Sequence, residues 1–367
     1  MHQEPDILSR RQWVVPAAML VGNLLCAATQ LYFSNSSEAV ETPPPAIEQR
    51  RSTLEVVPPA DEPPDTAESP QPPIAAAPAD QRSLAELNAG LNALIDEDRN
   101  LSSTGIELER QRALLRLRMY RYLCRLPQAD LTLNPQLNDD ALAAAAICRR
   151  LGKLSHAPEN PGIPDAEFQR ARGAASKCNL SFGRGNLTKA IDFWMDDSDP
   201  RNFSRLGHRR WCLNPQMLKL GVGRDDDFCA MWAFDKSRPL AHEYEFISFP
   251  PPGYVPVDMF GPAYAWSITL NPGKYIAPEL KNITVELFPI RDGQADREHP
   301  LEVENLTVDR HGFGVNNCVI FRPKSLDVRP LQSYQLELHG LQTIDGKPTS
   351  VQFAVRFVEA MVPATPE

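Results

Sequence analysis

The hydrophobic pattern of this 367-residue chain changes its period near residue 240. Before that point, apolar residues recur every three or four positions, as they do on one face of a helix. After it, the segments NITVELF, SYQLELHGL and SVQFAVRFV alternate apolar and polar residues, and turn-forming residues separate them. The sequence therefore predicts an α+β protein, with a helix-containing domain over residues 83–239 and an all-β sandwich over residues 240–367.

The N-terminal segment indicates export. Arg10 and Arg11 precede an apolar stretch over residues 13–33, and the small residues around Cys26 offer a cleavage site. Residues 1–33 are therefore expected to be either a cleaved signal peptide or a membrane anchor, and both readings stay open. We expect an extracellular or periplasmic protein, either secreted or anchored to the membrane by this segment.

The composition of the rest of the chain indicates which kinds of protein it can be. Residues 34–82 are rich in proline and predict a disordered linker that spaces the folded part from the membrane. The 38 basic and 47 acidic residues give a net charge of −9, which disfavours nucleic acid as a partner. An even number of cysteines outside the leader predicts disulfide bonds in an exported chain, with the pairing left open. These cysteines are Cys124, Cys148, Cys178, Cys212, Cys229 and Cys318.

Capping signals predict where several helices begin and end. Ser83 with Glu86 three residues later predicts the start of a first helix, and a second helix is expected to end at Pro127. A third, alanine-rich helix is expected to open with Asn138 as its cap and to end near Gly152. Shorter helices are expected over residues 165–174 and 188–195, followed by strands at KLGVG and FCAMWAFD.

The β-rich part predicts an antiparallel sandwich of immunoglobulin-like kind. Its strands are short and alternating, and a proline-rich segment, FPPPGYVPV, leads into it. His311 and His339 fall on polar faces or in turns of this part. We expect both histidines to lie on the surface without a special role.

Three segments between residues 118 and 235 occur in the order found in a known family. They are RMYRYLCRLPQADLTLNPQLNDDALAAAAICRRLGKLSH, GRGNLTKAIDFWMDD and GHRRWCLNPQMLKLGVG. This order resembles the CAP superfamily (cysteine-rich secretory proteins, antigen 5 and class 1 pathogenesis-related proteins), and in particular its bacterial SCP-domain branch. The resemblance covers roughly a third of the chain. It implies an α-β-α sandwich, in which helices flank a small antiparallel sheet.

The resemblance also implies a site. In that family two histidines and two glutamates face one cleft, and some members hold a divalent cation there. By position the histidines are His156 and His208, the expected metal ligands, and imidazole suits zinc. Asp197 matches one glutamate and is the expected carboxylate of the site. Gly185 stands where the other glutamate belongs, so one acid is missing, and Glu159 is a candidate to replace it.

The missing acid favours binding over turnover. A hydrolase that uses a metal-bound water needs a carboxylate to take the proton, and only Asp197 or Glu159 could serve as that base. Arg184 would also repel a cation if it pointed into the cleft. We therefore expect a cell-envelope protein without enzymatic activity. Its cleft would bind a small apolar or lipid-like ligand, a divalent metal, or a cell-surface or wall partner.

Two other functions stay open. In the first, the chain is a metal-dependent, peptidase-like hydrolase with His156 and His208 as ligands. In the second, it is a structural or adhesive envelope protein, and the two histidines only brace neighbouring loops through hydrogen bonds.

Overall fold

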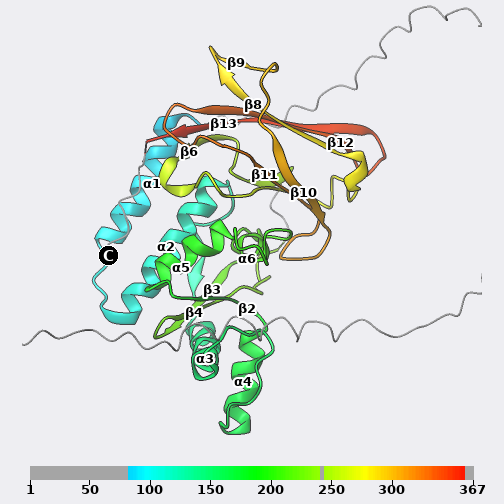
Figure 1. Ribbon diagram of the computed structural model, residues 1–367. Coiled ribbons are helices and arrows are strands. Elements are labelled where there is room, and N and C mark those ends of the chain that lie inside the picture. Colours follow the sequence, from blue (N-terminus) through cyan, green and yellow to red (C-terminus); the bar gives the residue numbers. More distant parts are fainter. Residues whose placement is uncertain (1–81, 240–243, 360–367) are drawn as a thin grey trace, which may run out of the picture. The chain divides into compact units, whose positions relative to one another are not determined.

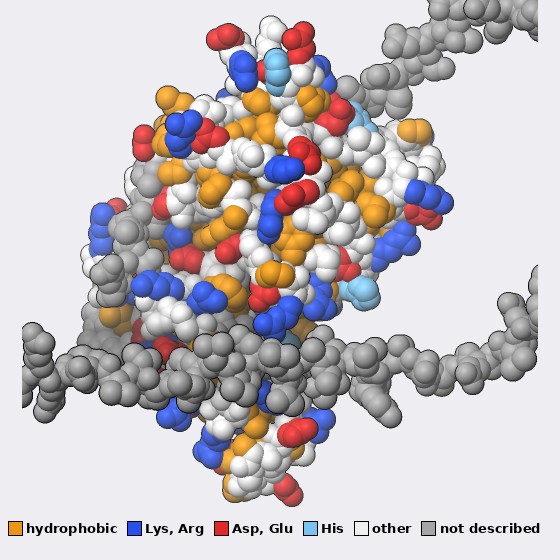
Figure 2. Space-filling model, in the orientation of Figure 1, with side chains coloured by type: hydrophobic (Ala, Val, Ile, Leu, Met, Phe, Trp, Pro, Cys, Tyr) orange, Lys and Arg blue, Asp and Glu red, His pale blue; other side chains and the backbone are white. Residues whose placement is uncertain are grey.

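The computed structural model describes residues 82–239 and 244–359, which form an α+β structure with several sheets (Figure 1). The predicted leader, and all of the predicted linker except residue 82, lie outside the described residues. Among the residues that are described, no helix is long and apolar enough to cross a membrane. On the face shown in Figure 2, acidic and basic side chains are interspersed, so the charge there is not gathered into one patch.

The α-helices all precede residue 213 in the described part of the chain, and only two short 3-10 helices, Val257–Met259 and Leu280–Asn282, follow it there. The first begins as predicted, because Ser83 Oγ accepts a hydrogen bond from Glu86 N (3.2 Å) and Glu86 Oε2 accepts one from Ser83 N (2.7 Å). The helices are α1 (Leu84–Arg99), α2 (Gly105–Leu123), α3 (Pro135–Leu151), α4 (Asp165–Ala175), α5 (Leu187–Asp196) and α6 (Gly207–Cys212).

Helix α3 begins one turn earlier than predicted. Its cap is Asn134, whose Oδ1 accepts from Leu137 N at 3.0 Å, and Pro135 occupies the first helical position, where a missing N–H costs nothing. The predicted cap, Asn138, is a buried residue inside the helix, and its Oδ1 accepts from Val222 N at 2.9 Å. The prediction for Asn138 was wrong, whereas the helix does end at Gly152, which is left-handed with φ 64°.

The first sheet has the strand order β1-β3-β4-β2. Strands β3 (Lys219–Asp225) and β4 (Phe228–Trp232) were predicted, whereas β1 (Thr132–Leu133) and β2 (Cys178–Phe182) were not. Strand β1 is too short to show a period, and four of the five residues of β2 are buried, so neither shows the alternation of a half-exposed strand. Strands β2, β4 and β3 are antiparallel neighbours, and β1 pairs with β3 in parallel.

Helices cover both faces of this sheet (Figure 1). Alternate residues of β4 show this: Phe228 and Ala230 pack into a core with α3 and α4, whereas Cys229 and Met231 belong to a core that includes α2 and α5. Helix α3 lies very close to β3, since a Cβ added at Gly223 would be 2.2 Å from a backbone nitrogen of α3. The alanines of α3 and the glycines of β3 therefore permit close packing.

The β-rich part contains two sheets, with the strand orders β10-β11-β7-β5 and β6-β13-β12-β8-β9. The three predicted alternating segments lie in β8, β12 and β13. Most neighbours are antiparallel as predicted, but β6 pairs with β13 in parallel, and the immunoglobulin-like arrangement stays a prediction. The strands are β5 (Phe246–Phe249), β6 (Gly253–Pro256), β7 (Trp266–Leu270), β8 (Thr284–Arg291), β9 (Gln294–Ala295), β10 (Val303–Asp309), β11 (Cys318–Pro323), β12 (Ser333–Gln342) and β13 (Pro348–Val358).

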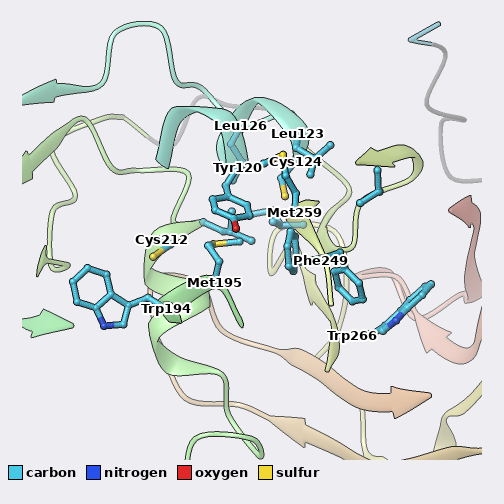
Figure 3. Packing of buried hydrophobic residues seen from close by; sticks show 14 of the residues in the cluster. Tyr120, Leu123, Cys124, Leu126, Trp194, Met195, Cys212, Phe249, Met259 and Trp266 are labelled. Atoms are coloured by element: carbon cyan, nitrogen blue, oxygen red, sulfur yellow. The ribbon is translucent and has the colours of Figure 1, made fainter. Parts of the chain in front are cut away.

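The helix-rich and β-rich parts share one hydrophobic core. A single buried cluster contains residues of α1, α2, α5 and α6 and of both β-rich sheets. Figure 3 shows Tyr120 of α2, Met195 of α5 and Phe249 of β5 in this cluster, and the rings of Tyr120 and Phe249 meet edge to face with centroids 5.9 Å apart. The two sheets also meet directly, because Phe246 of β5 stacks on Phe353 of β13 at 5.5 Å. The change of period near residue 240 thus separates two kinds of secondary structure, but not two cores.

The predicted disulfide bonds do not form among the described residues. The six cysteines outside the leader are all free and buried. Cys178 and Cys229 lie on neighbouring strands, but Cys178 is opposite Trp232 and Cys229 is opposite Ser181. They are therefore offset by three residues, about 10 Å along the strand, which is too far for a disulfide. These thiols pack as small apolar side chains.

Candidate functional site

Asp197 connects helix α5 to helix α6. It follows the last residue of α5 in a left-handed conformation (φ 48°), and it is 0% exposed. Its Oδ2 accepts hydrogen bonds from the backbone N–H groups of His208 (3.0 Å) and Arg209 (3.3 Å), at the start of α6. Asp197 therefore satisfies backbone donors that this helix end would otherwise leave without partners.

The same carboxylate orients the imidazole of His208. Nδ1 of His208 donates to Oδ1 of Asp197 at 2.8 Å, and the His208 side chain is only 14% exposed. Because a carboxylate accepts this hydrogen bond, a ring with one proton carries it on Nδ1 and has its lone pair on Nε2. Histidines that bind metals are commonly held in this way, with the second nitrogen bonded to a carboxylate.

His156 is held through the same ring nitrogen. It lies in the loop after α3, and its Nδ1 donates to the backbone oxygen of Ala175 at 2.9 Å. A carbonyl oxygen also only accepts, so Nε2 of His156 is again the atom with the lone pair. His156 is exposed, but partial loss of solvent around its ring, together with the charges of His208 and Arg205, lowers its pKa from the ordinary value of 6.5.

Both predicted histidines are hydrogen-bonded to the segment around the start of strand β2. Ala175, which holds His156, is four residues before Asn179, whose side-chain Nδ2 donates to the backbone oxygen of His208 at 3.1 Å. His208 is close enough to influence the pKa of His156. Neither Nε2 atom is hydrogen-bonded to any residue within the described ranges.

The two candidate acids are placed differently. Both oxygens of Asp197 are engaged, one by the imidazole and one by backbone N–H groups, so its observed role is to position a histidine. Glu159 is exposed in the loop after α3. That Asp197 or Glu159 binds a metal directly or acts as a catalytic base therefore stays a prediction.

Arg184, which stands beside the missing acid, lines a separate hollow. Its guanidinium lies over the ring of Phe193, with 3.6 Å between Cζ and the ring centroid. The hollow has a volume of about 310 Å³, and Asp196 and Tyr264 also line it. Burial and the neighbouring aspartates raise the pKa of Tyr264 to about 12, so its hydroxyl is protonated at neutral pH.

Arg209 attaches α6 to the β-rich part. The side chain is 0% exposed, and it donates to the backbone oxygens of Met195, Asp196 and Ala265, each at 2.6 Å, and to Ser267 Oγ at 3.2 Å. Burial lowers the pKa of Arg209, partly offset by the charge of Asp197. This one side chain therefore joins the end of α5 to strand β7.

Arg210 makes a second attachment. It pairs with Asp309 at 2.5 Å and donates to the backbone oxygens of His311 (2.5 Å) and Val315 (2.7 Å). The sequence analysis did not assign a role to Arg209 or Arg210. The sequence does contain one indication of their role, since the two arginines directly precede the apolar residues WCL. If this segment is buried, each guanidinium must find hydrogen-bond acceptors.

Comparison with known proteins adds one weak likeness. No family model and no curated protein matches the chain. A solved structure of an extracellular protein containing an SCP domain, from Bacillus anthracis str. Ames, is similar with 19% sequence identity and a TM-score of 0.25. The match covers 41% of this chain and 43% of the other, so the chain spans less than half the length of that protein. The resemblance to the CAP superfamily accordingly stays a prediction from the motifs.

Proposed function

We propose that this chain is an exported cell-envelope protein that binds a divalent metal ion of the zinc type between His156 and His208. The proposal includes the CAP-type character of the helix-rich part and the immunoglobulin-like character of the β-rich part. The observation that carries it is that both rings are fixed through Nδ1, which leaves both Nε2 lone pairs available. Neutral imidazoles held in this way are the usual ligands of zinc.

Binding rather than turnover is the function that the geometry supports best. A metal-bound water is activated by a carboxylate that can accept its proton. Asp197 is buried, and both of its oxygens already accept hydrogen bonds from α6 and its histidine. The remaining coordination positions would be filled by water or by a polar group of a ligand or partner at the cell surface.

Two asparagine substitutions test the site without removing its hydrogen bonds. In His156→Asn and His208→Asn the side-chain amide can still donate to the backbone oxygen of Ala175 and to Asp197, but it lacks an atom at the Nε2 position. Isothermal titration of the full-length chain with Zn²⁺ should show that each substitution weakens one site by at least about a hundredfold. The matched control is His299→Asn, which changes an exposed histidine that is paired with Asp296.

Urea unfolding of the same variants should show little change in stability, because the hydrogen bonds remain. If the double variant His156→Asn/His208→Asn binds Zn²⁺ with the same stoichiometry and affinity as the unchanged chain, the proposed site is wrong.

A further inference from the structure

Strands β8 and β12 place three metal-binding side chains on one face of their sheet. Glu286 of β8 and Glu337 of β12 are directly opposite in the antiparallel register, and His339 is two residues beyond Glu337. Since side chains alternate along a strand, Glu337 and His339 point to the same face, whereas Leu336 and Leu338 on the other face belong to the core. This group lies outside the site built around His208.

The donor atoms of this group are already spaced as metal ligands are. Nε2 of His339 is 3.2 Å from Oε2 of Glu337 and 3.7 Å from Oε2 of Glu286, and the three donor atoms all lie within 4.8 Å of one another. Ligands about 2.0–2.2 Å from a tetrahedral zinc ion are separated from one another by about 3.3–3.6 Å. Little movement is therefore needed to bind an ion.

Arg297 holds the buried carboxylate of Glu337. Its Nη2 donates to Oε1 of Glu337 at 2.5 Å, its Nη1 donates to Oε2 at 3.3 Å, and its guanidinium packs over the ring of Phe288. Glu337 is only 3% exposed, so this contact fixes its orientation and turns Oε2 toward His339. Glu286 and Glu337 repel each other across the strand pair, and the single charge of Arg297 balances only one of the two carboxylates, so a bound cation would offset the remaining negative charge.

We propose that Glu286, Glu337 and His339 form a second divalent-metal site of the zinc type, independent of the one proposed at His156 and His208. Three protein ligands leave a fourth position for water. On binding, the ring changes tautomer: the proton on Nε2, which is donated to Glu337, passes to solvent, and solvent returns one proton to Nδ1, so that Nε2 has a lone pair for the ion. The His339 side chain is 38% exposed, so water can accept that Nδ1 proton.

The test uses the full-length chain with His156→Asn and His208→Asn already present, so that the first site cannot bind. Isothermal titration with Zn²⁺ should then show one remaining equivalent. Adding Glu286→Gln or His339→Asn should weaken it by at least about a hundredfold, and His299→Asn should leave it unchanged. Glu286 is 44% exposed, so its replacement should not disturb folding, which circular dichroism would check.

Each outcome bears on one site. If the background variant binds no Zn²⁺ while the unchanged chain binds one equivalent, the second site is overturned and the first stands. If Glu286→Gln and His339→Asn both leave the remaining equivalent at full affinity, the second site is likewise overturned. If the unchanged chain binds one equivalent that is lost with Glu286→Gln and kept with His208→Asn, the second site stands and the first fails.

Discussion

Replacing Arg209 by methionine tests whether the helix-rich and β-rich parts depend on each other. Methionine keeps much of the side-chain length but donates nothing, so the backbone oxygens of Met195 and Ala265 each lose a donor at 2.6 Å. Hydrogen bonds from a charged donor contribute about 1.5–3 kcal/mol each, and relief of the buried charge offsets part of that loss. We expect Arg209→Met to lower the free energy of unfolding by about 3–5 kcal/mol, which is a large fraction of the free energy of unfolding of a typical protein.

Urea unfolding followed by tryptophan fluorescence and circular dichroism measures this change. Arg209→Lys should lose nearly as much, because one ammonium cannot reach acceptors on both α5 and β7. The control is Arg329→Met, since Arg329 is 78% exposed and its pair with Asp327 should contribute less than about 1 kcal/mol. A loss below about 1 kcal/mol for Arg209→Met would refute the reasoning that this side chain joins the two parts.

Three further predictions concern protonation, packing and thiol reactivity. Folding lowers the pKa of His156 from its ordinary value of 6.5. The contribution of His156 to stability should therefore be complete above pH 6.5 and should be lost as the pH falls through the lowered pKa. In urea unfolding at a series of pH values, His156→Asn should flatten the stability–pH curve over this range. Gly223→Ala should cost at least about 2 kcal/mol in thermal or urea unfolding, because its Cβ would meet the backbone of α3, whereas Gly173→Ala, with open space around its Cβ, should be neutral or stabilising. Burial raises the pKa of Cys124 to about 12, and all six described cysteines are buried, so a thiol reagent should label them only on unfolding; rapid labelling of the native chain would contradict this burial.

Local signals in the sequence were sufficient for much of the secondary structure. The capping box at Ser83, the left-handed end of α3 at Gly152 and the alternation in β8, β12 and β13 all depend on residues a few positions apart. The start of α3 was missed because two asparagines, Asn134 and Asn138, could each cap it, and only the second has a long-range partner in Val222. Strand β2 was missed because burial on both faces removes its alternation.

The site was predictable only in part. The motif order suggested that His156 and His208 face one cleft. The structure attaches both histidines to the segment around the start of strand β2, and their shared site stays a prediction. The role of Asp197 in holding the start of α6 and the ring of His208 was not predictable. The sequence shows a carboxylate three residues after Trp194, but it does not show the turn that directs this carboxylate toward α6. The contacts of Arg210 with Asp309 and Val315 join residues 99 and 105 positions apart, which no local pattern encodes. The prediction of disulfide bonds was wrong for a similar reason, since composition does not set the distance between two thiols.

Helix α6 carries His208, Arg209 and Arg210 as consecutive residues, and each reaches a different neighbourhood of the protein. Cutting the chain near residue 240 to isolate the histidine pair would remove two of the four acceptors of Arg209, and it would remove Asp309 and the backbone oxygens of His311 and Val315 from Arg210. Recombining this N-terminal part with an unrelated C-terminal part would have the same effect, unless the new part offered carbonyl groups and a carboxylate at the same places. The two parts can therefore be exchanged between proteins only as a matched pair.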